Sequence, residues 1–249
     1  MDDDNSFIQV FLMTLSDDLS EKVENIFSQS VDDRDGRVVP YTDDVKLDSD
    51  SVKLDATLLY ADLSQSSKLA TDFYKKTAAK IIRSFLYCMS RLITEHDGVI
   101  VSFDGDRVMG VFIGKIKNTN AVKCGLKMNY VVQKIIKPKA ENYFTSLEKN
   151  RYDVSHCVGI DTGTVLAVRA GQRGSNDLVW IGRAPNLAAK LSDIREGIYH
   201  TYISDDVFKM MHNSAKYSDE SNKLMWEERI YNFLEEKILI HRSGWRWKV

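Results

Sequence analysis

Apolar residues along the chain follow two different periods, which predict alternating strands and helices after residue 52. Short apolar runs bounded by turn residues are typical of strands, and apolar residues three to four positions apart are typical of helices. We expect strands at residues 54–63, 99–103, 108–112, 178–181 and 202–204, helices at 64–96 (in two parts), 120–137, 182–194 and 205–211, and closing strands after Trp226.

Three local signals divide these elements. Asp104-Gly105-Asp106-Arg107 separates two apolar runs and predicts a hairpin. Pro138 is expected to end the preceding helix, and Thr162-Gly163-Thr164 is read as a turn between two strands in residues 154–171. The order strand–helix–strand–strand–helix–strand predicts an α+β fold of the ferredoxin-like type.

The first 51 residues have a different pattern. An apolar stripe at helical spacing predicts an amphipathic helix within residues 6–27, which must bury this stripe against the body, a partner subunit or another protein. Residues 29–51 are rich in Asp and Ser and read as an exposed linker. We therefore divide the chain into an acidic helix and linker, 1–51, and a compact domain, 52–249. The stripe consists of Phe7, Phe11, Leu15, Leu19, Val23 and Ile26.

Charge supports the same division. The 249-residue chain has a formal net charge of −2, but residues 1–55 carry 15 acidic and 5 basic residues, a net −10, which leaves +8 on the remainder. With 43% hydrophobic residues the chain can form a sizeable core, which excludes collagenous and wholly disordered classes. A basic body favours polyanionic ligands such as nucleotides.

The cysteines and the apolar runs exclude other classes. Cys88, Cys124 and Cys157 lie far apart and are odd in number, so neither a disulfide framework nor a zinc site is expected. No apolar run reaches the roughly 20 residues of a membrane span. We expect a cytoplasmic protein that binds neither membrane nor nucleic acid, although Trp245 and Trp247 among basic residues also allow a nucleic-acid stacking platform.

Two carboxylates occupy positions suited to metal binding. Asp62 ends an apolar strand before a Ser-rich loop, and Asp106 lies in the predicted hairpin turn. If these strands are neighbours, both carboxylates enter one cleft, where they suit Mg²⁺ or Mn²⁺ held jointly with phosphates. The backbone N–H groups of residues 63–67, ahead of a helix, offer a phosphate cradle. Taken singly, each Asp also suits a helix cap or a turn.

In this order and spacing, four motifs across residues 54–211 resemble the class III nucleotidyl cyclase domain. They are an aromatic-x-Asp strand end, a Gly-Asp hairpin, a Gly-x-x-x-Gly strand and an Asn-x-x-x-basic helix. They read Tyr60-Ala61-Asp62-Leu63-Ser64-Gln65-Ser66-Ser67, Asp104-Gly105-Asp106, Val158-Gly159-Ile160-Asp161-Thr162-Gly163 and Asn186-Leu187-Ala188-Ala189-Lys190.

The resemblance implies a reaction and a set of site residues. A nucleoside triphosphate would cyclise when its 3′-hydroxyl attacks the α-phosphorus and expels pyrophosphate. Two Mn²⁺ or Mg²⁺ ions would be held by Asp62, Asp106 and the Leu63 carbonyl, and the nucleotide would meet Tyr60 and the loop serines, Ser64, Ser66 and Ser67. Asn186 would orient the ribose, and residue 190 would contact the α-phosphate. Family members form head-to-tail homodimers, so Asn186 and Lys190 would face the carboxylates of the other chain.

This chain departs from the family at the positions that select the base and stabilise the transition state. Position 190 is Lys where the family has Arg, which keeps the charge but loses the bidentate fork. Lys190 is otherwise a solvated helix lysine, with Arg183 or Arg173 supplying the charge. The purine-selecting positions are Ser102 and Val179, and neither reproduces the family's hydrogen bonds to adenine or guanine.

These departures favour a pyrimidine substrate. Tyr60 adds bulk and a hydroxyl where Phe is usual, and residues 182–192 resemble the pyrimidine cyclases of the Pycsar anti-phage system. We therefore expect conversion of UTP to cyclic UMP. The alternatives are CTP, an adenylate cyclase with a diverged base pocket, or a catalytically dead nucleotide-binding relative. Arg246 and Lys248 are candidates for the triphosphate.

Overall fold

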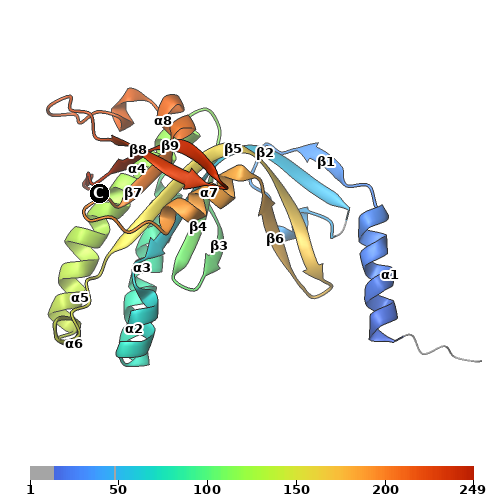
Figure 1. Cartoon of the computed structure of the whole chain (residues 1–249), viewed down its shortest axis with the longest axis horizontal. Coiled ribbons are helices and arrows are strands. Elements are labelled where there is room, and N and C mark those ends of the chain that lie inside the picture. Colours follow the sequence, from blue (N-terminus) through green and yellow to red (C-terminus); the bar gives the residue numbers. More distant parts are fainter. Residues whose placement is uncertain (1–13, 48) are drawn as a thin grey trace, which may run out of the picture.

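A computed structural model of the chain describes residues 14–47 and 49–249 (Figure 1). The predicted stripe residues Phe7 and Phe11 lie outside the described residues. The strands are β1 (Asp32–Asp35), β2 (Asp50–Leu63), β3 (Val99–Asp104), β4 (Arg107–Ile113), β5 (His156–Gln172), β6 (Ser175–Ile181), β7 (Thr201–Ser204), β8 (Glu227–Phe233) and β9 (Glu236–Ser243). The helices are α1 (Leu15–Ser28), α2 (Ser66–Asp72), α3 (Lys75–Glu95), α4 (Lys117–Val131), α5 (Lys137–Tyr143), α6 (Ser146–Lys149), α7 (Arg183–Ser192) and α8 (Asp205–Met210), with a π-helical turn at Val132–Ile136 and 3₁₀ turns at Thr42–Asp44 and Asn213–Ala215.

All the described strands join one sheet, in which β2 and β5 form the longest pairing. The order is β3-β4-β2-β5-β7-β9-β8, with β1 added beside β2 and β6 beside β5. β2 pairs antiparallel with β4 and with β5, and the β5 pairing covers every residue from Ser51 to Leu63. The order β5-β2-β4-β3, connected through α3 and α4, confirms the predicted ferredoxin-like α+β fold.

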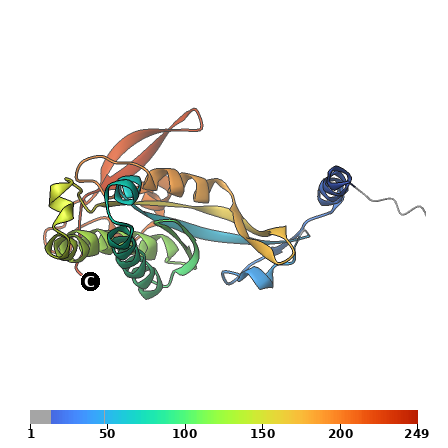
Figure 2. The ribbon, with the colours of Figure 1, turned by 90° about the horizontal axis from the view of Figure 1, so that it is seen from below.

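Helices cover both faces of this sheet (Figure 2). On one face, Phe85, Met89 and Ile93 of α3 share a core with residues of α4. On the other face, Leu187 and Leu191 of α7 pack in a second cluster. In each helix these side chains recur four positions apart, so each helix buries one apolar side against the sheet. No helix among the described residues is long and apolar enough to span a membrane.

The packing of α7 on the sheet depends on the absence of a side chain at Gly159 of β5. A Cβ atom there would lie 2.1 Å from the carbonyl oxygen of Ala188 and 2.5 Å from the amide nitrogen of Ser192. Real Cβ atoms do not approach backbone atoms so closely, so any side chain would push α7 off the sheet. Gly159 therefore fixes the distance of α7 from β5.

The predicted turn at Thr162-Gly163-Thr164 is wrong, because β5 is one continuous strand. Gly163 pairs directly with Ala56 of β2, and the Thr162 hydroxyl donates to the Ala56 carbonyl at 3.1 Å. The long partner strand keeps these residues extended, and this pairing overrides the local preference of a Thr-Gly-Thr sequence for a turn.

Pro138 does not end the helical region as predicted. Val132–Ile136 forms a π-helical turn, and Pro138 then lies in the first turn of α5, where its missing N–H needs no partner. The wider turn lets the helix axis continue past the proline.

The predicted linker also contains structure. β1 pairs in parallel with the start of β2, and Val39 and Val45 are buried. The sequence pattern does not predict β1, because all four of its residues are charged and it lacks the alternation of apolar and polar side chains that indicates a strand.

Gly159→Ala tests the close approach of α7. We expect a loss of at least about 2 kcal/mol in the free energy of unfolding, because the new methyl group meets backbone atoms. Gly125→Ala in α4 is the matched control, since its Cβ would meet side chains at 3.1 Å or more. Urea unfolding measures both. Equal stability of the two variants would contradict the packing constraint.

Buried His156 predicts a stability that falls at acid pH. Burial, His200 and Arg195 hold the pKa of His156 well below its usual range, and the ring stacks on His200 at 5.2 Å. The unfolded chain therefore binds a proton below about pH 6.5 that the folded chain excludes, so stability drops by up to about 1.4 kcal/mol per pH unit from this group. His156→Phe should flatten the pH dependence of urea unfolding between pH 6.5 and 5. An unchanged slope would contradict this account.

Candidate active site

Asp62 lies where three central strands meet. It is the last residue but one of β2, and the strand register places it opposite Arg107 of β4 and Cys157 of β5. Its residue surface is only 9% exposed. The Arg107 Nε atom lies 3.2 Å from one carboxylate oxygen, and the Arg195 guanidinium pairs with the other. Asp62 is therefore a nearly buried carboxylate held between two arginines.

Asp106 comes to the same place from the β3–β4 turn. Gly105 adopts a φ of +62° there, a left-handed conformation that glycine adopts without strain. The Oδ2 atom of Asp106 is buried without a hydrogen-bond partner. Asp106 directly precedes Arg107, whose backbone pairs with that of Asp62, so the two carboxylates belong to neighbouring strand ends. The structure thus brings the two predicted metal ligands together.

Burial is the largest influence on the protonation of Asp62. It raises the pKa of the carboxyl group; Arg107 and Arg195 lower it, Asp106 raises it, and the net shift is upward. Burial also raises the pKa of neighbouring Tyr152 above its usual range, and Asp106 adds to that shift. Burial, rather than an excess of negative charge, is therefore the main cause of both upward shifts.

The loop after β2 is held by backbone contacts rather than by its serine side chains. The Ser64 N–H donates to the Ser155 carbonyl at 2.9 Å, and the Tyr152 hydroxyl donates to the Ser64 carbonyl at 2.9 Å. The Ser64 hydroxyl is buried without a partner. Gln65 has a φ of +59° and turns the chain into α2, whose first residues, Ser66 and Ser67, are half-buried and exposed.

The residues around Asp62 fit a divalent metal ion. An unpartnered buried carboxylate oxygen beside a second carboxylate supplies hard oxygen donors. Among the described residues, no group of three or more His, Cys, Asp or Glu side chains could hold a metal ion by itself. Ligands from a bound phosphate and from a backbone carbonyl, such as that of Leu63, are therefore needed to complete the coordination.

Asn186 and Lys190 lie on the exposed side of α7. They are four residues apart and so share one helix face. The Asn186 amide donates to the Gly182 carbonyl at 3.0 Å. Within the described part of the chain, neither side chain makes a hydrogen bond or ion pair with Asp62 or Asp106. Within one chain, the two predicted α7 residues therefore do not contact the two predicted metal ligands.

The three predicted base-pocket residues lie on three different strands. Tyr60 is half-buried on β2, and burial raises the pKa of its hydroxyl. Ser102 is half-buried on β3, next to an irregularity in the pairing with β4. Val179 is 45% exposed on β6. The three side chains therefore differ in their exposure to solvent. Tyr60 lies two residues before Asp62 in the same strand.

Sequence reasoning missed Arg107 and Arg195, the two partners of Asp62. Arg195 follows α7, and its guanidinium also donates to the carbonyl of Ser192. Arg107 bridges Asp62 and Asp193, so the end of α7 is tied to the end of β2. The position of Arg107 directly after Asp106 is the one local signal that pointed to it.

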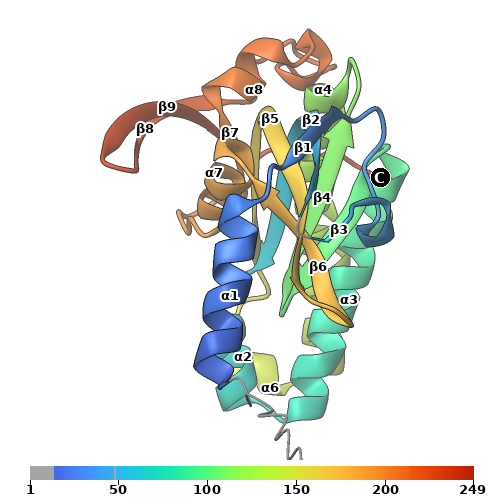
Figure 3. The same ribbon diagram turned by 90° about the vertical axis from the view of Figure 1, so that its right-hand side faces the viewer.

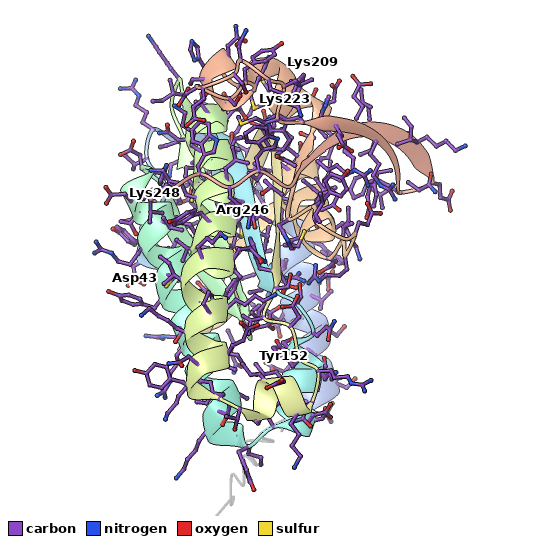
Figure 4. All side chains as sticks on the ribbon, turned by 90° about the vertical axis from the view of Figure 1, so that its left-hand side faces the viewer. Asp43, Tyr152, Lys209, Lys223, Arg246 and Lys248 are labelled. Carbon is purple, nitrogen blue, oxygen red and sulfur yellow. The ribbon has the colours of Figure 1, made fainter. Side chains whose placement is uncertain are left out.

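The other cations considered for the phosphates are placed elsewhere. Arg183 pairs with Asp206 at 2.9 Å and lies 3.9 Å from buried Asp161. Arg173 is exposed between β5 and β6. The C-terminal segment with Arg246 and Lys248 runs beside α4 (Figure 4), where the Trp247 N–H donates to the Leu126 carbonyl.

This chain is similar in sequence to two uridylate cyclases over nearly its whole length. A uridylate cyclase of Rhodovulum sp. (strain MB263) is 44% identical over 235 residues, which cover 94% of this chain and 98% of the relative. A uridylate cyclase of Xanthomonas perforans is 38% identical over 238 residues, which cover 95% of this chain and all of the relative. Both matches include the stretches that carry the two carboxylates and α7.

Solved structures have the same fold at low sequence identity. The guanylyl cyclase Cya2 superposes with a TM-score of 0.64 at 17% identity, covering 78% of this chain and 94% of its own. The adenylyl cyclase CyaB from P. aeruginosa gives 0.58 at 18% identity, covering 78% and 95%.

The sequence profile of the adenylate and guanylate cyclase catalytic domain matches residues 50–224, which include Asp62, Asp106, Asn186 and Lys190. Together with the two uridylate cyclases and the shared fold, this match shows that the chain belongs to the class III nucleotidyl cyclases.

Proposed function

We propose that this cyclase converts UTP to 3′,5′-cyclic UMP and pyrophosphate. The observation that carries the proposal is the placement of Asp62 and Asp106 at neighbouring strand ends, with Asp62 nearly buried, in a chain similar over almost its full length to uridylate cyclases. In this reaction O3′ of the ribose bonds to the α-phosphorus, the bond to the bridging oxygen breaks, and pyrophosphate leaves as the hydroxyl proton is released.

Asp62, Asp106 and the carbonyl of Leu63 would hold two Mn²⁺ or Mg²⁺ ions. When bound, such ions make the attacking hydroxyl more acidic and offset charge on the leaving oxygens. Arg107 and Arg195 would give up part of their contact with Asp62 as the ions and the triphosphate arrive. Their guanidinium groups then lie beside an anionic substrate, where planar donors suit phosphate oxygens.

The exposed face of α7 supports an active site shared between two chains. Asn186 would orient the ribose and Lys190 would contact the α-phosphate, and both side chains point outward rather than contacting their own chain's carboxylates. A head-to-tail homodimer would place this face against Asp62 and Asp106 of the partner. The site is then incomplete in a single chain.

Tyr60, Ser102 and Val179 would form the base pocket. Uracil offers two carbonyl oxygens and one N–H, and a serine hydroxyl both donates and accepts hydrogen bonds. The apolar Val179 side chain offers no partner to the amino groups of a purine. The names of the relatives favour uridine over cytidine. The resemblance to Pycsar cyclases extends the proposal to second-messenger synthesis in the cytoplasm during anti-phage defence.

Separate incubations with UTP, CTP, ATP and GTP and Mn²⁺ test the substrate. We expect cyclic UMP as the main product, at least ten times faster than cyclic AMP, with products identified by mass spectrometry. Preferential cyclisation of ATP would contradict the pyrimidine assignment. Turnover of none of the four nucleotides would favour a nucleotide-binding protein without catalysis.

Complementation between two inactive chains tests the shared site. Asp106→Ala and Asn186→Ala should each reduce turnover at least about 100-fold, because each removes a part of every site in a homodimer. Each heterodimer should recover up to about half of the activity of a wild-type dimer, because one of its two sites then contains only native residues. Absence of recovery in heterodimers verified by differential tags would contradict the arrangement.

A further inference from the structure

The helix α1 lies outside the body of the molecule and presents an apolar stripe. Every residue from Leu15 to Ser28 is exposed, and the stripe side chains include Leu15 at 73%, Leu19 at 55% and Val23 at 47% exposure. A capping box at Thr14 starts the helix, with the Asp17 side chain bound to the Thr14 backbone. The helix is thus well defined by local interactions, while its apolar side still needs a partner.

A groove on the opposite part of the molecule has a matching surface. It lies between α3 and the α4–α5 region, has a volume of about 610 Å³, and is lined largely by apolar and aromatic side chains. Tyr87 and Tyr143 in its walls are 69% and 76% exposed. The lining side chains are Lys80, Ile81, Arg83, Ser84, Tyr87, Cys88, Ile135, Ile136, Lys139, Ala140, Tyr143 and Phe144.

The helix and the groove have complementary charges. Leu15–Ser28 carries four acidic residues and one lysine, a net charge of −3. The groove is lined by Lys80, Arg83 and Lys139, with no acidic side chain among the described residues that line it. An acidic helix with one apolar side fits an apolar groove with basic edges, the usual mode of helix-in-groove recognition.

The groove of the same chain is out of reach. In Figures 1 and 2, α1 and α5 lie at opposite ends of the molecule, and α1 is the element nearest the viewer in Figure 3. Only residues 29–31 separate α1 from β1, which is fixed beside β2. Three residues span at most about 11 Å, so α1 cannot cross the sheet to its own α3 and α5.

We propose that α1 of one chain docks in the α3–α5 groove of a second copy of the chain. The stripe of Leu15, Leu19, Val23 and Ile26 enters the groove, and the acidic side chains meet Lys80, Arg83 and Lys139. This docking of α1 adds a contact between protomers that is separate from the site of Asp62 and Asp106. It assigns a role to the acidic N-terminal segment that the cyclase reaction itself does not require.

Cys88 in the groove provides a natural reporter for this contact. A tagged chain with Leu19→Cys and Cys88→Ser is mixed with the wild-type chain and oxidised with diamide at pH 8.5, because burial raises the pKa of the Cys88 thiol. We expect a disulfide between position 19 of the tagged chain and Cys88 of the wild-type chain, mapped by mass spectrometry. No nucleotide is needed, so the result is independent of cyclase activity.

Matched controls make the result specific to the apolar side of α1. Ser28→Cys with Cys88→Ser places the sulfur on the opposite side of the helix by the 3.6-residue period, and should give at least five times less crosslink. In the Leu19→Cys background, Arg83→Glu in the wild-type partner should lower the yield, whereas Lys237→Glu on exposed β9 should not.

Three outcomes would overturn the proposal. The first is a disulfide between two position-19 sulfurs, which would show α1 paired with α1. The second, in a chain with Leu19→Cys alone, is a disulfide to Cys88 within the same chain. The third is equal crosslinking from positions 19 and 28, or none from position 19.

Discussion

The structure depends on the pairing of β2 with β4 and β5 on its two sides. This register places Asp62 beside Arg107 and holds the β3–β4 turn, with Asp106, over the same strand end. The same β5 strand carries Gly159, where α7 rests on bare backbone. The two carboxylates and the helix with Asn186 are therefore positioned by one set of strand pairings, which also hold the short turn that carries Asp106.

Much of this arrangement could be predicted from the sequence, because local patterns fixed most elements. The hairpin around Asp106 and the helix with Asn186 follow from turn residues and apolar spacing. The partner that holds Gly163 of β5 extended, Ala56, lies more than 100 residues away, so local signals wrongly predict a turn at Thr162-Gly163-Thr164. Local preference says nothing about such a distant partner.

The electrostatic partners of the site were beyond sequence reasoning for the same reason. Arg195 and Asp62 are 133 residues apart, and only the docking of α7 on β5 brings them together. Their pairing changes the picture of the site. A bare carboxylate pair would repel itself, whereas Arg107 and Arg195 both favour the ionised form of Asp62. The two arginines thus offset carboxylate charge at this strand end.

We propose above all that Asp62 and Asp106 hold the metal ions of a nucleotide site. Binding of Mn²⁺, measured by electron paramagnetic resonance in the presence of 3′-deoxy-UTP, tests it directly because this analogue lacks the attacking hydroxyl and cannot be cyclised. We predict saturable, nucleotide-dependent binding of Mn²⁺ to the wild-type chain and its loss in Asp106→Asn. Undiminished Mn²⁺ binding in Asp106→Asn would contradict the assignment of the site.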